Sequence, residues 1–382
     1  MKFLSLGKID KNIIPITVGC IFCFLSRLLF RFTEDSALFE HSILSNIIIS
    51  ISYIFTIIPF LILKYRTYNK QKKENIQNND LEDSEDNSTV EQKDITKGKW
   101  LYIFLYNFIE LVQSIILIYS IELKSNYWIL DIFITCIFYY FIFKIKLYKH
   151  HYFSMIIIII IGIILDLVRE NLQYDIKNNL IFILLRLLRE TLVSLNDVHA
   201  KYLFDKKFCL IYEISLSNGI MNTFLYIILA IFDHYFIQFD DFSKYFDEFN
   251  IKELSVIIGL MVTQLGLYLC ILIVNKANTP CHIFIIFVFG QLAYYIDFSK
   301  ISILFMVCLL LILFMSLIFN EIIEINCFGF EKNTKKNIEK RARMESNDLL
   351  VLDIQLIKDK EEVDLEENDL DSTELIEIKK PE

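Results

Sequence analysis

Long apolar stretches separated by short polar segments dominate the pattern of this chain. Each stretch is close to the roughly 20 residues that an α-helix needs to cross the hydrocarbon core of a bilayer. The pattern predicts an all-α integral membrane protein with ten transmembrane helices. The predicted spans 1 to 10 cover, in order, residues 13–32, 42–63, 99–119, 127–143, 152–168, 180–204, 212–237, 252–274, 279–296 and 302–319.

Two polar segments interrupt this pattern. Residues 64–98 lack hydrophobic periodicity, which predicts a disordered cytosolic loop. Residues 326–382 begin with a basic run, Lys332–Arg343, and continue as an acidic cytosolic tail. The basic run is expected to contact anionic membrane lipid beside the last span. The chain is therefore divided into an N-terminal membrane half (1–168), a C-terminal membrane half (169–325) and the tail.

The composition is typical of a helical membrane protein. The chain is 55% hydrophobic, with a mean hydropathy of +0.46, and it contains 34 Phe but only 4 Pro. Soluble domains contain about 45–50% apolar residues even when Gly is included. The net charge of −9 comes mostly from the two polar segments, and the 8 Cys are scattered, mostly within apolar stretches, so no disulfide framework is expected.

Lys and Arg alternate between rich and poor loops along the predicted spans. Residues 64–98, 144–149 and 201–207 are rich in Lys, whereas the loops on the opposite side hold one or two basic residues each. The positive-inside rule then predicts that both termini are cytosolic. Nine or eleven spans would break this alternation, so the charge pattern favours ten.

Ten spans divide into two sets of five, and an odd number per set makes the two halves inverted in the membrane. The ends of spans 3 and 8 support such a repeat. QSIILIYSIELKSNYWIL (Gln113–Leu130) and QLGLYLCILIVNKANTPCHI (Gln264–Ile283) both have a mid-span Gln, then Lys-x-Asn and an immediate return into the membrane. The sequence therefore predicts two inverted five-helix repeats.

Span 6 carries charged residues at a depth where each costs about 2.5–3.5 kcal/mol on insertion scales. Arg186, Arg189, Glu190, Asn196 and Asp197 follow a period close to that of an α-helix, so most of them share one face. Ionic residues are tolerated in a span when they face the interior of a bundle or a water-filled cavity. We therefore expect span 6 to line a polar pocket.

Polar residues of spans 3, 7, 8 and 9 extend this predicted pocket. The candidate substrate-binding residues are Arg186, Arg189, Glu190, Glu110, Gln113, Asn218, Asn222, Gln264 and Gln291. The amide side chains either bind a solute or join helices by hydrogen bonds, and the sequence favours neither alternative. Glu110 either pairs with Arg189 across the bundle or acts as a proton-coupling carboxylate.

The pairing of the two arginines determines which solute charge is expected. Arg186 and Glu190 are four residues apart on a helix and can neutralise each other. If Arg189 pairs with Glu110 as well, the pocket suits a neutral or zwitterionic solute. If Arg189 stays unpaired, its guanidinium suits a phosphate or a carboxylate, and we slightly favour an anionic solute.

The sequence contains no recognisable catalytic, cofactor or metal motif. It lacks GxGxxG and the P-loop pattern, and its histidines do not have metal-ligand spacings. The adjacent His150 and His151 are expected to be solvated at a membrane interface. A further polar group is expected near the cytosolic surface, where it would anchor or gate: Asp197, His199, Lys201, Lys206, Lys207 and Glu213.

Two segments carry a resemblance to a known family. NDVHAKYLFDKKFCLIYEISLSNGI (Asn196–Ile220) and NKANTPCHIFIIFVFGQLA (Asn275–Ala293) resemble the drug/metabolite transporter superfamily, in particular its nucleotide-sugar-transporter-like and EamA-type solute carriers. The resemblance implies alternating access around a central cavity and export or exchange of a metabolite. It also implies that spans 5 and 10 serve as a scaffold or as the surface of a homodimer.

We therefore expect a secondary transporter, not an enzyme, that moves a small polar metabolite across an endomembrane. Two alternatives stay open: a membrane-embedded lipid-modifying enzyme, for which only residues 196–213 approach a suitable cluster, and a transport-inactive receptor or scaffold. Acidic dileucine-like segments at 345–350 and 371–376 would suit a vacuolar or endosomal address, and the Golgi or ER is the other expected location. No nucleic-acid partner is expected.

Overall fold

The computed structural model describes residues 4–6, 13–32, 42–78, 98–119, 127–145, 147–170, 180–237, 251–295, 303–325, 334 and 337. The chain divides into two compact units, one formed by Met1–Gly7 with Ile323–Glu382 and the other by Lys8–Ile322. In the first unit, strand β1 (Leu4–Leu6) pairs antiparallel with strand β2 (Ile323–Ile325). This small sheet is a departure from the all-α prediction, which holds for the described residues of the second unit.

Helices occupy each of the ranges predicted to span the membrane. They are α1 (Ile13–Phe32), α3 (Ser42–Ile54) followed by α4 (Ile57–Asn78), α6 (Lys99–Tyr119), α7 (Asp131–Phe143), α8 (Lys149–Glu170), α9 (Leu180–Lys207), α10 (Ile211–Phe232), α12 (Ile251–Ala277), α13 (Ile283–Gln291) and α14 (Ile303–Phe319). Among the described residues, 4 helical stretches are long and apolar enough to cross a membrane: Ile43–Thr67, Lys99–Ile118, Ile211–Tyr235 and Leu254–Ala277. The general prediction of a helical membrane protein is therefore confirmed.

A break separates α3 from α4 within the second predicted span. Pro59 has no N–H group, and its ring excludes the carbonyl of Phe55, so the helix cannot continue unbroken through this point. The chain bridges the break with a hydrogen bond of 3.3 Å from the N–H of Ile58 to that carbonyl and one of 2.6 Å from the hydroxyl of Thr56 to the carbonyl of Tyr53.

Helix α4 continues to Asn78, whereas the sequence predicts a disordered loop from residue 64. Residues 64–78 contain several good helix formers and neither Pro nor Gly. A helix that is already nucleated needs only one hydrogen bond for each residue added, so polar residues can extend it. The rest of the predicted loop, up to residue 97, lies outside the described residues.

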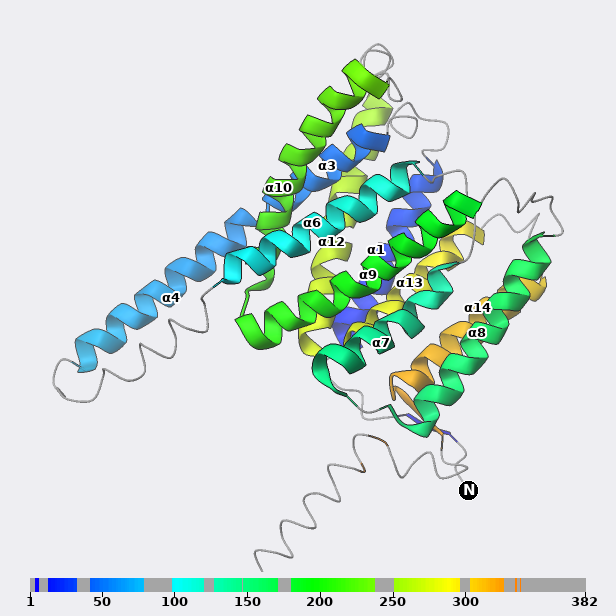
Figure 1. The fold of residues 1–382 in the computed structure, drawn as a ribbon. Coiled ribbons are helices and arrows are strands. Elements are labelled where there is room, and N and C mark those ends of the chain that lie inside the picture. Colours follow the sequence, from blue (N-terminus) through cyan, green and yellow to red (C-terminus); the bar gives the residue numbers. More distant parts are fainter. Residues whose placement is uncertain are drawn as a thin grey trace, which may run out of the picture. The chain divides into compact units, whose positions relative to one another are not determined.

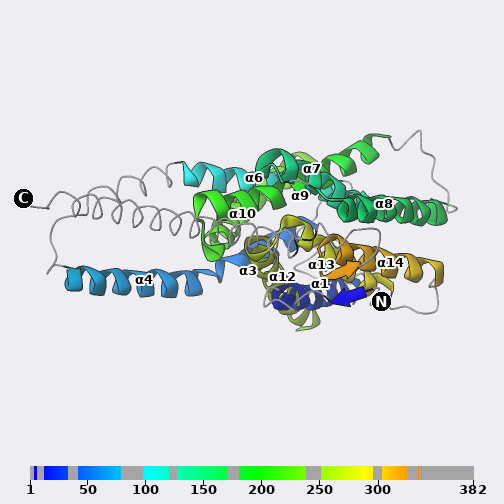
Figure 2. The ribbon, with the colours of Figure 1, turned by 90° about the horizontal axis from the view of Figure 1, so that it is seen from below.

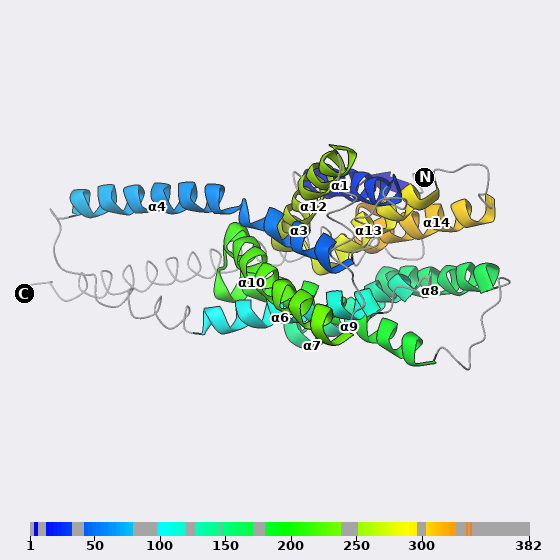
Figure 3. The same cartoon turned by 90° about the horizontal axis from the view of Figure 1, so that it is seen from above.

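The helices of the second unit lie in two layers, seen edge-on in Figures 2 and 3. One layer contains α1, α3, α12, α13 and α14, and the other contains α6, α7, α8, α9 and α10. In the first layer α1 packs against α12 and α13, and in the second layer α9 packs against α6 and α7. Helix α3 crosses α10 and α14 runs beside α8 (Figure 1), so these pairs join the layers. Each layer thus combines helices from both predicted halves.

Helices α7 and α13 begin in the same way. A 3-10 turn, Tyr127–Leu130, precedes α7, and another, Pro280–His282, precedes α13.

Buried apolar side chains from α7, α8, α13 and α14 form a shared core, in which Ile158, Phe284 and Ile312 are almost fully enclosed.

Large apolar side chains also cover much of the outer surface of the helices. Leu101, Phe141 and Phe224 are each more than half exposed. Water-soluble proteins rarely expose extended apolar patches, whereas a bilayer provides an apolar environment for such side chains. The surface therefore agrees with a protein surrounded by lipid.

Candidate functional site

A buried polar network joins helices α6, α10 and α12. Asn218 on α10 donates hydrogen bonds of 2.7 Å both to Oε2 of Glu110 on α6 and to the hydroxyl of Tyr268 on α12. Tyr268 in turn donates to the hydroxyl of Tyr106 at 3.2 Å, and Asn222 donates to the amide oxygen of Asn218. The four-residue spacing of Asn218 and Asn222 puts both on the inner face of α10. We call these five residues the Glu110 network.

Aromatic packing holds this network in position. The ring of Tyr53, beside the break between α3 and α4, stacks on that of Tyr268, with 4.4 Å between centroids and 18° between planes. Close approach of α10 to α3 depends on Gly219, because a Cβ atom at this position would lie 2.7 Å from the backbone nitrogen of Ile54. The sequence thus supplies a residue without a side chain next to Asn218, where two helix backbones meet.

A second polar group lies between α7 and α9. We call its five residues, Asp131, Thr135, Arg189, Glu190 and Ser194, the Asp131 network. Ser194 on α9 donates to a carboxylate oxygen of Asp131 at the start of α7, and Thr135 donates to the same oxygen at 3.3 Å. One turn earlier on α9, Glu190 is only 3% exposed and accepts from Nη1 of Arg189 at 2.7 Å. Asp131 was not among the candidate residues, because its position near one end of a span carried no signal of depth.

Asp197 lies within electrostatic reach of both networks. The carboxyl groups of both Asp131 and Glu110 contribute to its electrostatic environment. The backbone carbonyl of Asp197 accepts a hydrogen bond of 2.6 Å from Asn275 on α12. Polar residues of spans 3, 4, 7 and 8 thus pack around span 6 (α9). The sequence predicts that spans 3, 6, 7, 8 and 9 converge on one cavity, and Gln291 of span 9 belongs to neither network.

Of the two alternatives left open for Arg189, neither a pair with Glu110 nor an unpaired guanidinium is what the structure shows. Glu190 is the partner of both arginines, at 2.7 Å from Arg189 and at 3.5 Å from Arg186. Glu110 instead accepts from Asn218 and forms no salt bridge within the described residues. The physical reason is the rotation of the helices, which directs Glu110 towards α10 and α12, while Arg189 lies near α7 and within electrostatic reach of Asp131.

Two of the candidate amides join helices. Gln113 on α6 donates to the backbone carbonyl of Leu192 on α9 at 2.8 Å. Gln264 on α12 donates to the hydroxyl of Ser26 on α1 at 2.7 Å. Their donors are therefore engaged in helix–helix contacts. Gln291, the last residue of α13, is half-buried.

Several buried polar atoms near these networks have no hydrogen-bond partner among the described residues. They include Oδ1 of Asn196, Oδ1 of Asn222, Oδ1 of Asn275 and Nε of Arg189. Leaving a buried donor or acceptor unsatisfied costs about 1–3 kcal/mol. Water or a polar solute at these positions would remove that penalty.

The residues predicted near the cytosolic surface form links between helix ends. Lys201 donates to the backbone carbonyl of Lys276 at 3.1 Å and lies 3.4 Å from Asp205. Lys99, at the start of α6, forms an ion pair of 2.6 Å with Glu213 at the start of α10. The role of this group in anchoring or gating stays a prediction. Asp197, which the sequence analysis assigns to the same group, instead lies within electrostatic reach of Asp131 and Glu110.

The turn between α9 and α10 does not present a reactive cysteine. Cys209 is buried, its backbone N–H donates to the carbonyl of Leu203 at 3.1 Å, and burial raises the pKa of its thiol to about 11. The thiolate is the nucleophilic form, so Cys209 is poorly suited to attack a substrate at neutral pH.

The prediction that His150 and His151 are solvated is wrong for His150, which is only 4% exposed. Helix α14 and the residues that follow it cover this end of α8, and Nε2 of His150 lies 3.1 Å from Oε1 of Glu321. The sequence around the two adjacent histidines could not reveal that His150 is covered. The covering residue Glu321 lies 171 positions further along the chain.

No model of a known protein family matches this chain, and no curated protein matches it either.

Proposed function

We propose that this protein is a secondary transporter that moves a small polar metabolite across an endomembrane by alternating access. The observation that carries the proposal is the polar core around α9, where the Glu110 network, the Asp131 network and Asp197 meet inside a helical membrane protein. Ionisable groups in a membrane interior are costly, and they commonly mark the path of a substrate or an ion.

The pairing of the arginines favours a neutral or zwitterionic solute over an anionic one. Arg186 and Arg189 share one carboxylate partner, Glu190, so their charges are partly compensated. Asp131, Glu110 and Asp197 form no salt bridge within the described part of the chain. A solute with an ammonium group would find acceptors among these carboxylates, and Arg189 would still be near a carboxylate of the same solute.

The packing of the helices supports two inverted repeats of five spans. If each span is exchanged with the span five positions away in the predicted order, α1 corresponds to α9, α12 to α6 and α13 to α7. The contacts of α1 with α12 and α13 then correspond to those of α9 with α6 and α7. The bonds from Gln264 to α1 and from Gln113 to α9 correspond in the same way. An exact inverted repeat would produce all of these correspondences.

Contacts between helix ends support the proposed topology of ten spans. Lys201 meets Lys276, Lys99 meets Glu213, and His150 meets Glu321. Each contact joins two segments that the ten-span topology assigns to the cytosolic side. Pairing of β1 with β2 requires an even number of crossings between Leu6 and Ile323, in agreement with two cytosolic termini.

A transport assay in proteoliposomes tests the function directly. The purified full-length protein is reconstituted, and uptake is measured for labelled panels of zwitterionic, neutral, cationic and anionic metabolites. We expect saturable uptake of a zwitterionic or neutral solute, and we expect that excess unlabelled solute on the inner side accelerates it by exchange. Protein-dependent uptake of none of the four classes, with correct insertion shown by protease protection, would contradict the proposal.

A further inference from the structure

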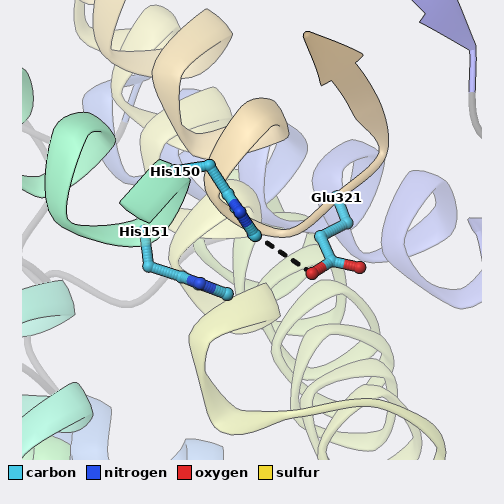
Figure 4. Close-up of side chains that lie close together, drawn as sticks. All are labelled: His150, His151 and Glu321. Carbon is cyan, nitrogen blue, oxygen red and sulfur yellow. Dashed lines mark hydrogen bonds and ion pairs between the residues drawn. The ribbon is translucent and has the colours of Figure 1, made fainter. Parts of the chain in front are cut away.

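Two histidines and a glutamate come together at the end of the helix pair α8 and α14. His150 and His151 lie in the first turn of α8, and Glu321 follows the last turn of α14 (Figure 4). One potential ligand atom from each residue lies within 4.8 Å of the other two. Residues so far apart in the sequence meet only because α8 packs against α14.

His150 is buried without full satisfaction of its ring nitrogens. Its Nε2 contacts Oε1 of Glu321 at 3.1 Å, whereas its Nδ1 has no hydrogen-bond partner among the residues that the structure describes. The side chain is about nine-tenths or more enclosed, at 5% exposure. A buried imidazole nitrogen that keeps a free lone pair is a favourable ligand for a metal ion.

Glu321 occupies a backbone position where glycine is usual. Its φ angle is 57°, in the left-handed region, two residues after the last residue of α14. The N–H of Glu321 bonds to the carbonyl of Ile318 at 3.0 Å, and that of Ile322 bonds to the carbonyl of Leu317 at 2.9 Å. These two bonds form a Schellman motif, which holds the backbone of Glu321 in place. A residue with a side chain is disfavoured in this conformation, so Glu321 adds a local conformational cost that glycine would not.

Aromatic contacts also hold the two imidazole rings. The centroids of the His150 and His151 rings are 4.0 Å apart, and the ring of His151 meets that of Phe319 edge-on at 4.9 Å. Nδ1 of His151 accepts a long hydrogen bond of 3.2 Å from the N–H of Tyr148. Binding of a metal through Nε2 of His151 would move the ring proton to Nδ1, so this bond has to open when the metal binds.

We propose that His150, His151 and Glu321 bind one divalent transition-metal ion, with zinc as the expected metal. Two imidazoles and one carboxylate form a common zinc ligand set, and water would complete the coordination. Ligand atoms around tetrahedral zinc lie roughly 3.3 Å apart, given bonds of about 2.0–2.1 Å. The three ligand atoms lie within 4.8 Å of one another, so no pair has to approach by more than about 1.5 Å when the ion binds. The bound ion clamps the start of α8 to the end of α14. This site is separate from the polar core around α9 and does not depend on the proposed transport function.

Zinc binding to the purified full-length protein tests this site. A purification tag without histidine is used, and the protein competes with a chromophoric zinc indicator. We expect a stoichiometry of one zinc ion per chain at the high-affinity site and an increase in the thermal unfolding temperature when zinc is added. His150→Ala and Glu321→Gln should weaken zinc binding by at least about 100-fold, more than the 10–100-fold typical for the loss of an outer-shell partner. His234→Ala removes an exposed histidine outside the cluster and serves as the matched control.

A Glu321→Gly variant separates a metal site from an ordinary ion pair. Glycine suits the left-handed backbone at this position, so we expect this variant to unfold, without metal, at a temperature close to that of the wild type. It should nevertheless lose the stabilisation by zinc. The proposal is overturned if the wild type binds no more zinc than the variant with all three residues replaced, or if Glu321→Gly keeps the zinc response. Equal loss of binding in His234→Ala would also overturn it.

Discussion

The carboxylate of Glu110 accepts a hydrogen bond from the side-chain amide of Asn218, with 2.7 Å between Oε2 and Nδ2. The same amide nitrogen donates to Tyr268, and the amide oxygen accepts from Asn222. Asn218 is therefore the centre of a network that joins three helices, and it links a buried carboxylate to the aromatic residues behind it.

Replacement of Asn218 by Ala should impair transport. The change leaves Glu110 without its amide donor and Asn222 without its acceptor, at a cost of about 1–3 kcal/mol for each unsatisfied group. If a free-energy cost of about 1–3 kcal/mol arises in the complex with the solute, the affinity for the solute falls by roughly 5–150-fold. Initial uptake rates in proteoliposomes with matched protein content measure it. The control is Ile220→Ala on the same helix, which alters an apolar side chain that is 54% exposed on the surface. Equal transport by both variants would contradict the role of the network.

Gly219→Ala should destabilise the protein. Its Cβ atom would lie 2.7 Å from the backbone nitrogen of Ile54 and 3.0 Å from the carbonyl oxygen of Ser50, and backbone atoms cannot rotate away. Overpacking of this kind typically costs about 1–3 kcal/mol, which outweighs the gain of up to about 1 kcal/mol in helix propensity. Thermal unfolding in detergent measures the change.

Gly259→Ala is the matched control for this prediction. A Cβ atom on Gly259 would meet only the terminal methyl groups of Leu29, at 3.2 and 3.6 Å, and this flexible side chain can adjust. We therefore expect Gly259→Ala to be neutral or slightly stabilising. If both variants unfold at the temperature of the wild type, α10 does not approach α3 as closely as described.

Gln113→Leu and Gln264→Leu should lower stability and leave solute affinity nearly unchanged. Each removes one bond between helices, to Leu192 and to Ser26 respectively. Such bonds contribute about 0.6 kcal/mol on average in a membrane protein, with a maximum of about 1.7 kcal/mol. A double-mutant cycle of Gln264→Leu with Ser26→Ala should give a coupling energy in this range. A large rise in KM without loss of stability would instead assign these amides to the solute.

The side on which residues 170–179 lie distinguishes ten crossings from four. If only the 4 long helices cross the membrane, the segment between Lys99–Ile118 and Ile211–Tyr235 is on the same side as the N-terminus. With ten crossings, five precede residues 170–179, so this loop lies on the opposite side. A protease-cleavable tag inserted there should be protected in sealed vesicles oriented with the N-terminus outside. Cleavage of the tag as rapid as that of an N-terminal tag would exclude the ten-span topology.

Part of the candidate site could be predicted from the sequence. The charges in the middle of span 6 and the amides of span 7 indicated a polar interior, and Glu110, Asn218, Arg189 and Glu190 do lie in polar networks. The partners of these residues could not be predicted, because Glu110 and Arg189 both lie at mid-span and the sequence does not show how their helices are rotated. The inclusion of Asp131 was missed for a similar reason, since its contact with Ser194 depends on how α7 packs against α9.

Hydropathy determined where the apolar helices lie, because the cost of exposing backbone groups to lipid makes each long apolar stretch helical whatever its neighbours are. It did not determine the polar continuation of α4 to Asn78. The Lys and Arg content of each loop determined the expected orientation in the membrane, because this signal also lies within short stretches of sequence. The tertiary structure alone decided that Arg186 and Arg189 share Glu190, that Asn218 faces Glu110, and that His150 meets Glu321. These contacts depend on the rotation and crossing of packed helices, which arise from many side chains acting together and have no signature in any single stretch of sequence.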